Sequence, residues 1–153
     1  MIKGFRLGAG VIAILGIASV AYAQMAPAPI MARQEDMKGQ GAAAAAMTKM
    51  IRGETPWDQA AAVTALTTIN ATAKKIPDLF KENVTAPADV KNDALPAIWA
   101  NKADFDAKAK ALEEASGKVL VLAQAGNEAE VKAQMPTVGR SCGGCHEGYR
   151  LKR

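Results

Sequence analysis

Two cysteines and one histidine stand close together near the end of the sequence, and the chain has no others. Cys142, Cys145 and His146 occupy positions i, i+3 and i+4, so on a helix they share one stripe. The pattern C-x-x-C-H is the attachment signature of a c-type haem. Two thiols about one turn apart can add to the two vinyl groups of one porphyrin, and the neighbouring imidazole can reach its iron. The spacing therefore predicts a covalently attached haem c, with Cys142 and Cys145 as its anchors and His146 as the proximal iron ligand.

The first residues predict export out of the cytoplasm, and motifs of this kind receive their haem outside the bacterial cytoplasm. Lys3 and Arg6 precede an uncharged apolar run, which leads into the small residues Ala-Tyr-Ala that end at Ala23. This order is typical of a secretory signal peptide, and the apolar run is too short and too rich in Gly and Ala for a membrane helix. We therefore expect residues 1–23 to be a signal peptide. Residues 24–153 then form one periplasmic domain with no stable membrane insertion.

The charge of the exported part is close to neutral. Without Lys3 and Arg6, the 19 basic residues fall to 17, against 15 acidic ones. Nucleic-acid binding needs a concentrated basic surface, and this balance argues against it.

The composition from residue 24 onward predicts helices. Alanine is abundant, while runs of β-branched and aromatic residues are missing. Thr55 and Pro56 are typical of a helix start, Gly126 of a helix end, and Asn127 of the next N-cap. Pro136 removes a hydrogen bond inside the last helix and should kink it. The four expected helices cover about residues 29–52, 55–75, 96–125 and 127–150, with a long connection at 77–95.

Apolar residues that recur at the helical period predict how these helices pack. They give the second and third helices one buried face each, and short connections favour antiparallel neighbours. The expected fold is all-α, an antiparallel up-down-up-down four-helix bundle that encloses one covalently bound haem. With 5% aromatic residues the core is thin, and a haem would supply volume. The predicted core positions are Val63, Leu66, Ile69, Ile98, Phe105, Ala109, Leu112 and Val119.

Other interpretations of the two cysteines fit the sequence less well. A structural zinc site needs about four protein ligands, and this cluster offers three. A redox C-x-x-C is usually found in a thioredoxin-like βαβ unit, and no strands are expected here. A disulfide between Cys142 and Cys145 is sterically open. It would make His146 incidental and the chain a helical structural protein.

A second iron ligand would have to come from the chain before the motif, because only seven residues follow His146. Methionine is the candidate type, since the chain has no other histidine. Met37 has two supporting features. Arg33, four residues earlier on the same stripe, could pair with a haem propionate, and Gly39 and Gly41 would let a flat macrocycle approach the backbone. The other methionines after the signal peptide are placed less well or fit the core, namely Met25, Met31, Met47, Met50 and Met135.

Two motifs resemble those of the cytochrome c′ family, the class II c-type cytochromes. One is R-Q-E-D-M from Arg33 to Met37, and the other is C-G-G-C-H-E-G-Y-R from Cys142 to Arg150. The family has a signal peptide, a four-helix bundle, C-x-x-C-H near the C-terminus and an Arg-x-x-x-Met/Leu/Phe element early in the first helix. The similarity covers essentially all of residues 24–153, and G-E-T-P-W-D-Q-A-A after the first helix is similar to low-spin members.

The resemblance implies two alternatives for function. In low-spin members a methionine at the position of Met37 binds the iron, and the protein is an electron carrier rather than an enzyme, serving periplasmic redox partner proteins. In high-spin members this residue only covers an open iron that takes nitric oxide or carbon monoxide, and some of these members also have methionine. The resemblance also places Arg150 near the proximal face of the haem. Some members pair through their first two helices, which leaves a weak homodimer open.

Overall fold

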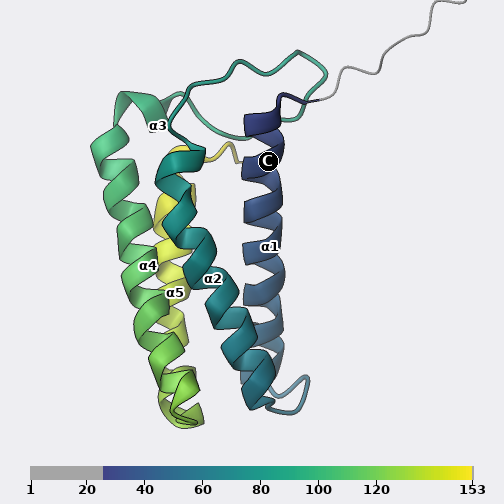
Figure 1. Ribbon diagram of the computed structural model, residues 1–153, viewed down its shortest axis with the longest axis vertical. Helices are drawn as coiled ribbons and strands as arrows, with labels where there is room; N and C mark the ends of the chain where they lie inside the picture. The colour runs from purple at the N-terminus through teal and green to yellow at the C-terminus, as the bar shows by residue number, and fades with distance from the viewer. Residues whose placement is uncertain (1–25, 153) are drawn as a thin grey trace, which may run out of the picture.

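The computed structural model describes residues 26–152, and its long helices form an up-down-up-down bundle (Figure 1). Within these residues there is no β-sheet, only one isolated bridge. The expected all-α fold is confirmed, whereas the predicted signal peptide lies outside the described residues. The helices are α1 (Ala28–Ile51), α2 (Gln59–Leu79), the single turn α3 (Ala97–Ala100), α4 (Lys102–Gln124) and α5 (Glu128–Tyr149).

The second helix begins and ends later than the sequence predicted. Asp58, not Thr55, is the N-cap, and its carboxylate accepts a hydrogen bond of 2.9 Å from the amide of Ala61. Asp is at least as good an N-cap residue as Thr, so both Thr55 and Asp58 were candidates for the N-cap of this helix. The helix also continues through Pro77, which lacks one hydrogen bond, because Ile76 and Phe80 on either side are buried in the core.

The third predicted helix is interrupted at Asn101, which separates α3 from α4. Its backbone (φ −127°, ψ 47°) is not helical, and Asn tolerates such conformations well. The predicted end at Gly126 is confirmed by its left-handed φ of 75°, and Asn127 caps α5 by accepting from the amide of Glu130. Pro136 lies inside α5, which is a single element from Glu128 to Tyr149, so the kink stays a prediction.

The long helices pack against one another in the order in which they occur in the chain. α1 packs on α2, α2 on α4, and α4 on α5, whereas α1 and α5 make almost no direct backbone contact. No helix within residues 26–152 is long and apolar enough to span a membrane. The predicted core is confirmed except at Val63, which is only partly buried. Fully or nearly fully buried are Leu66, Ile69, Ile98, Phe105, Ala109, Leu112 and Val119.

The end of α5 is tied to the connection between α2 and α3. The helix stops at Tyr149, and Arg150 is extended (φ −122°, ψ 135°) and forms an antiparallel bridge with Ala94. The amide of Leu95 donates to the carbonyl of Tyr149 at 3.1 Å, and that of Leu151 donates to Asp93 at 2.8 Å. The last helix, expected to reach about residue 150, therefore ends at Tyr149, because this bridge replaces the next helical turn.

A buried arginine fixes the other end of this connection to α1. Arg33 is 4% exposed, and it donates from Nε to the carbonyl of Leu79 (2.6 Å) and from Nη2 to that of Glu82 (2.5 Å). Its guanidinium lies 4.8 Å from the ring centre of Phe80 and 5.4 Å from that of Trp99. Burial lowers the pKa of Arg33, an effect that the carboxylate of Glu82 opposes. The two carbonyls and two rings therefore hold a charge that would otherwise be costly to bury.

Replacing this arginine should destabilise the fold strongly. We expect Arg33→Met to lower the free energy of unfolding by about 3 kcal/mol, because two charge-assisted hydrogen bonds and the ring contacts are lost. Urea unfolding of the haem-loaded protein measures this. Arg52→Met is the control, since the Arg52 side chain is highly exposed and its one ion pair among residues 26–152 is with Glu54 at 3.8 Å. Losing this pair should cost well under about 1 kcal/mol. Equal losses in the two variants would contradict the anchoring role.

Candidate haem site

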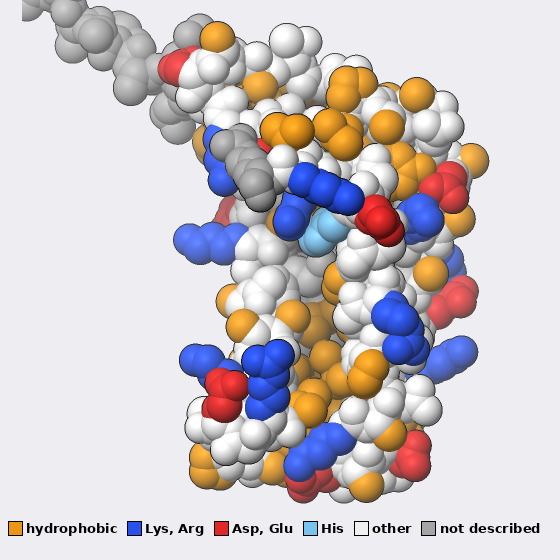
Figure 2. Space-filling view, turned by 180° about the vertical axis from the view of Figure 1, so that it is seen from behind, with side chains coloured by type: hydrophobic (Ala, Val, Ile, Leu, Met, Phe, Trp, Pro, Cys, Tyr) orange, Lys and Arg blue, Asp and Glu red, His pale blue; other side chains and the backbone are white. Residues whose placement is uncertain are grey.

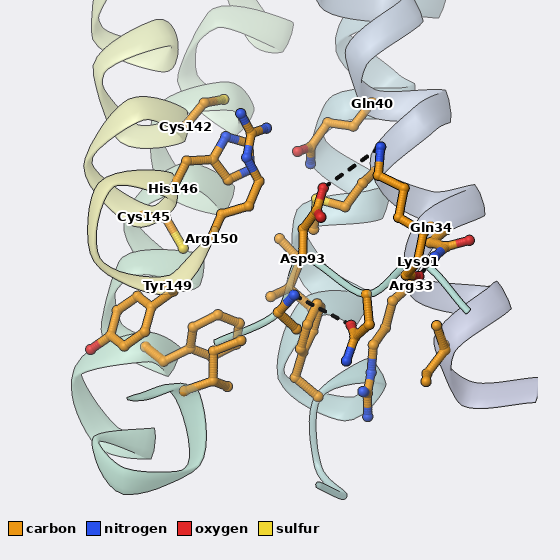
Figure 3. Close-up of a pocket in the computed structure, with 18 residues that line it drawn as sticks. Arg33, Gln34, Gln40, Lys91, Asp93, Cys142, Cys145, His146, Tyr149 and Arg150 are labelled. Atoms are coloured by element: carbon orange, nitrogen blue, oxygen red, sulfur yellow. Dashed lines mark hydrogen bonds and ion pairs between the residues drawn. The ribbon is translucent and has the colours of Figure 1, made fainter. Parts of the chain in front are cut away.

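A cavity of about 390 Å³ opens between α1 and α5, at the end of the bundle where α1 begins and α5 ends (Figure 3). Its size is in the range of pockets that hold organic ligands. α5 contributes Cys142, Cys145 and His146 to its lining, and α1 contributes Met37 from the other side. The structure thus brings the two predicted anchors and both predicted iron ligands into one cavity.

On the α5 wall, the helical repeat places both thiols and the imidazole towards the cavity. Cys142 and Cys145 are partly buried free thiols. Burial raises the pKa of both, so they are protonated at neutral pH. Burial also lowers the pKa of His146, and the positive charge of Arg150 lowers it further. The imidazole is therefore neutral at pH 7, the form whose free nitrogen can bind a metal.

The histidine remains accessible from outside. In Figure 2 it is the pale blue side chain in a hollow of the surface, with basic side chains beside it and apolar side chains below it. Arg150, which is exposed overall, lies beside His146 at the cavity (Figure 3). Arg150 is held there by an extended chain segment and not by a helical turn.

Five residues of α1 line the cavity, and three of them stand at spacing i, i+4 and i+7, namely Arg33, Met37 and Gln40. Met37 is partly buried, and it is the one methionine within residues 26–152 that lines this cavity. The expectation for Gly39 and Gly41 is wrong, because both are exposed and outside the cavity lining. The remaining described methionines are either in the core or at the surface. Met47, Met50 and Met135 are buried, and Met31 is 40% exposed.

The residues present fit a haem. The cavity is mainly apolar, as a porphyrin requires, with thiols and an imidazole on one wall and a thioether on the other. Arg33 adds an unsatisfied donor, since its Nη1 is buried with no hydrogen-bond partner among residues 26–152. A buried unpaired donor of this kind is costly, and a carboxylate of the cofactor would satisfy it. The other nitrogens of Arg33 that make contacts are used by backbone carbonyls, so the predicted propionate contact has this one nitrogen available.

An aromatic cluster in the cavity lining was not predicted from the sequence. The ring of Tyr149 packs edge-on against Phe105, and Phe105 packs against Phe80, both at 5.2 Å between ring centres. The hydroxyl of Tyr149 donates to the carboxylate of Asp104 at 2.6 Å, and this bond is the main cause that raises the pKa of Tyr149 to about 12. Tyr149 stands three residues after His146, so its spacing was a usable signal for a cavity residue.

The connection between α2 and α3 also contributes to the cavity, which no sequence pattern indicated. Residues 91–94 form part of its rim, and Gln34 on α1 donates to the carbonyl of Lys91 at 2.6 Å. Asp93 points into the cavity opening and pairs with Lys91 at 3.9 Å (Figure 3). The rim is therefore polar, whereas the interior is mainly apolar.

Comparison with known proteins identifies the family. The family model described as Cytochrome C' matches residues 28–150. A cytochrome c-556 from Agrobacterium tumefaciens is 39% identical over 121 residues, which cover 79% of this chain and 95% of that protein.

Solved structures of the family share the fold. Cytochrome c' from Rhodopseudomonas palustris superposes with a TM-score of 0.70 at 32% identity, covering 82% of this chain and 97% of that one. A variant of cytochrome c prime from Alcaligenes xylosoxidans, solved as its nitric oxide complex, gives a TM-score of 0.69 at 27% identity and covers 81% of this chain and 94% of that one. The C-x-x-C-H cavity and the family match over nearly all of the described residues lead to one conclusion: the chain belongs to the cytochrome c′ family, and it is a monohaem c-type cytochrome with covalently bound haem c.

Proposed function

We propose that this protein carries electrons in the periplasm, and that His146 and Met37 would both ligate the iron of its haem. The haem supplies a one-electron couple when bound. The observation that carries the proposal is the position of Met37, which lines the same cavity as His146 from the opposite helix. Cys142 and Cys145 hold the cofactor covalently, and the neutral imidazole of His146 is ready to coordinate.

Two arginines are proposed to hold the cofactor by its charges. Arg33 offers its unpartnered Nη1 to a propionate from the α1 side. Arg150 stands beside His146 and provides a positive charge on the proximal side. Both charges would favour an anionic cofactor edge at the cavity.

A second function is favoured by one comparison. The similar cytochrome c prime from Alcaligenes xylosoxidans was solved with nitric oxide bound. In the alternative, Met37 covers the iron without binding it, and the cavity admits nitric oxide or carbon monoxide. The two functions differ in one bond, from the thioether sulfur of Met37 to the iron.

The proposed compartment and partners follow from the sequence. Residues 1–23 are proposed as the signal peptide that directs export. The partners would be periplasmic redox proteins that exchange electrons with the haem at the cavity between α1 and α5. A weak homodimer through α1 and α2 remains part of this proposal. Nucleic acid is not an expected partner, given the nearly neutral charge.

The experiment is a set of spectra of the wild-type holoprotein, made in a periplasmic expression host. Ligation by Met37 predicts a low-spin ferric spectrum with a near-infrared thioether-to-iron charge-transfer band, and a ferrous form that resists carbon monoxide. A high-spin ferric spectrum with ready carbon monoxide binding would contradict electron transfer through a His/Met iron and support gas binding. A protein without any haem absorption would contradict both.

A further inference from the structure

Gln40 is a buried amide in the cavity that the proposed function has not used. It lies on α1 about one turn after Met37, is 6% exposed, and extends from α1 towards α5 (Figure 3). A primary amide is costly to bury in a largely apolar cavity unless its polar atoms are satisfied. The hydrogen bonds of this amide therefore decide which of its polar atoms can act on a group bound in the cavity.

The neighbouring Thr72 on α2 fixes which way this amide is turned. The hydroxyl of Thr72 lies 2.8 Å from the carbonyl oxygen of Thr68 and 3.0 Å from that of Ile69, so its one hydrogen is donated to the backbone of its own helix. It can then only accept from Gln40, and the amide nitrogen Nε2 stands 3.0 Å from it. A hydrogen-bond network of this kind decides between the two orientations of an amide.

With the nitrogen directed at Thr72, the carbonyl oxygen Oε1 of Gln40 is left on the other side of the amide. No donor among residues 26–152 makes a hydrogen bond to it. Oε1 is the negative end of the amide dipole. In a partly desolvated cavity its potential is screened far less than it would be in water.

The other polar groups of the cavity are arranged differently. Gln34 is exposed and donates to the backbone at Lys91, so water screens its dipole. Lys91 and Asp93 pair with each other at the rim, and the side chain of Lys91 is 66% exposed. Arg33 and Arg150 are cationic and act in the opposite sense to a carbonyl oxygen. Gln40 is thus a buried neutral amide at the cavity, and its carbonyl oxygen accepts no hydrogen bond from residues 26–152.

We propose that Gln40 sets the reduction potential of the site, because its carbonyl oxygen, oriented by Thr72, stabilises the oxidised iron more than the reduced iron. The oxidised state carries one more positive charge, so the oxygen lowers the potential. This inference rests on haem binding as proposed above, but it holds whether or not Met37 coordinates. Gln40 is a positioning residue in this role and need not touch the iron.

The test is a spectroelectrochemical titration of holoprotein variants. Gln40→Leu removes the dipole and keeps a side chain of similar size, so its potential should shift upward from the wild type with unchanged haem content. Gln34→Leu is the matched control, an amide lost from the same helix at the exposed rim, and its shift should be much smaller. Thr72→Val releases the amide nitrogen and should shift the potential upward by less than Gln40→Leu.

A conservative variant separates this role from a structural one. Gln40→Glu keeps a side-chain oxygen at the same position, so its potential should stay at or below that of the wild type. An unchanged or lower potential in Gln40→Leu would overturn the proposal. An upward shift in Gln40→Leu that occurs only with a changed spin state would also overturn it, because Gln40 would then act through the axial ligand. The spin state of the wild type tests Met37 separately, so the two proposals can fail independently.

Discussion

Met37→Ala is expected to convert a low-spin, six-coordinate iron into a high-spin one that binds carbon monoxide. The thioether on α1 competes with external ligands at high effective concentration, because the helix holds it inside the cavity. Its removal should raise the affinity of the ferrous protein for carbon monoxide by about 100-fold or more. The potential should fall, since a His/Met iron has a higher potential than one ligated by His alone.

Optical and carbon monoxide titrations of the variant measure both effects. Met31→Ala is a suitable control, because Met31 is also on α1 but is 40% exposed and outside the cavity lining. Its spectrum should match the wild type. A wild type that is already high-spin, and that Met37→Ala leaves unchanged, would show that Met37 is not a ligand and would favour the gas-binding alternative.

Loss of both attachment cysteines should abolish covalent haem. We expect Cys142→Ala or Cys145→Ala alone to reduce the haem that survives denaturation, since one thioether remains, and the double variant to retain none. Haem staining of a denaturing gel measures this. The haem-free double variant should also be less helical by circular dichroism, because a bound cofactor stabilises only the folded state.

The neighbouring serine provides a control for these substitutions. Ser141 lies on the same turn of α5 and is not part of the cavity lining, and among residues 26–152 its hydroxyl donates to the carbonyl of Thr137 alone. Ser141→Ala should keep its full haem content. Covalent haem in the double cysteine variant would remove the basis for the proposed attachment.

The parts of the structure that depend on local spacing could be predicted from the sequence. The i, i+3, i+4 spacing of Cys142, Cys145 and His146 fixes their common helix face, so their position in one cavity required no knowledge of the fold. Gly126 and Asn127 act within a few residues and were also predicted. Gln40 belongs to the same class, because it follows Met37 at i+3, and it could have been found by extending that stripe.

The rest depends on contacts between distant segments. Arg33 donates to Leu79 and Glu82, which are more than 40 residues away, so its anchoring role needs the packed structure. Arg150 leaves the helix because it pairs with Ala94 in the other connection. Proline and threonine preferences likewise gave the wrong bounds for α2, since Asp58 was a competing cap and the buried neighbours of Pro77 outweighed one missing hydrogen bond.

The first and last helices of the bundle, α1 and α5, make almost no direct backbone contact. Each long helix packs instead on the long helices next to it in the chain, as α1 on α2, α2 on α4 and α4 on α5. Such contacts require little loop closure, and a fold dominated by them forms rapidly. Bringing α1 and α5 together closes the longest loop of the chain between two helices. The cavity residues of these two helices face each other between them. A cofactor bound to both α1 and α5 would therefore connect the two helices that do not pack on each other directly.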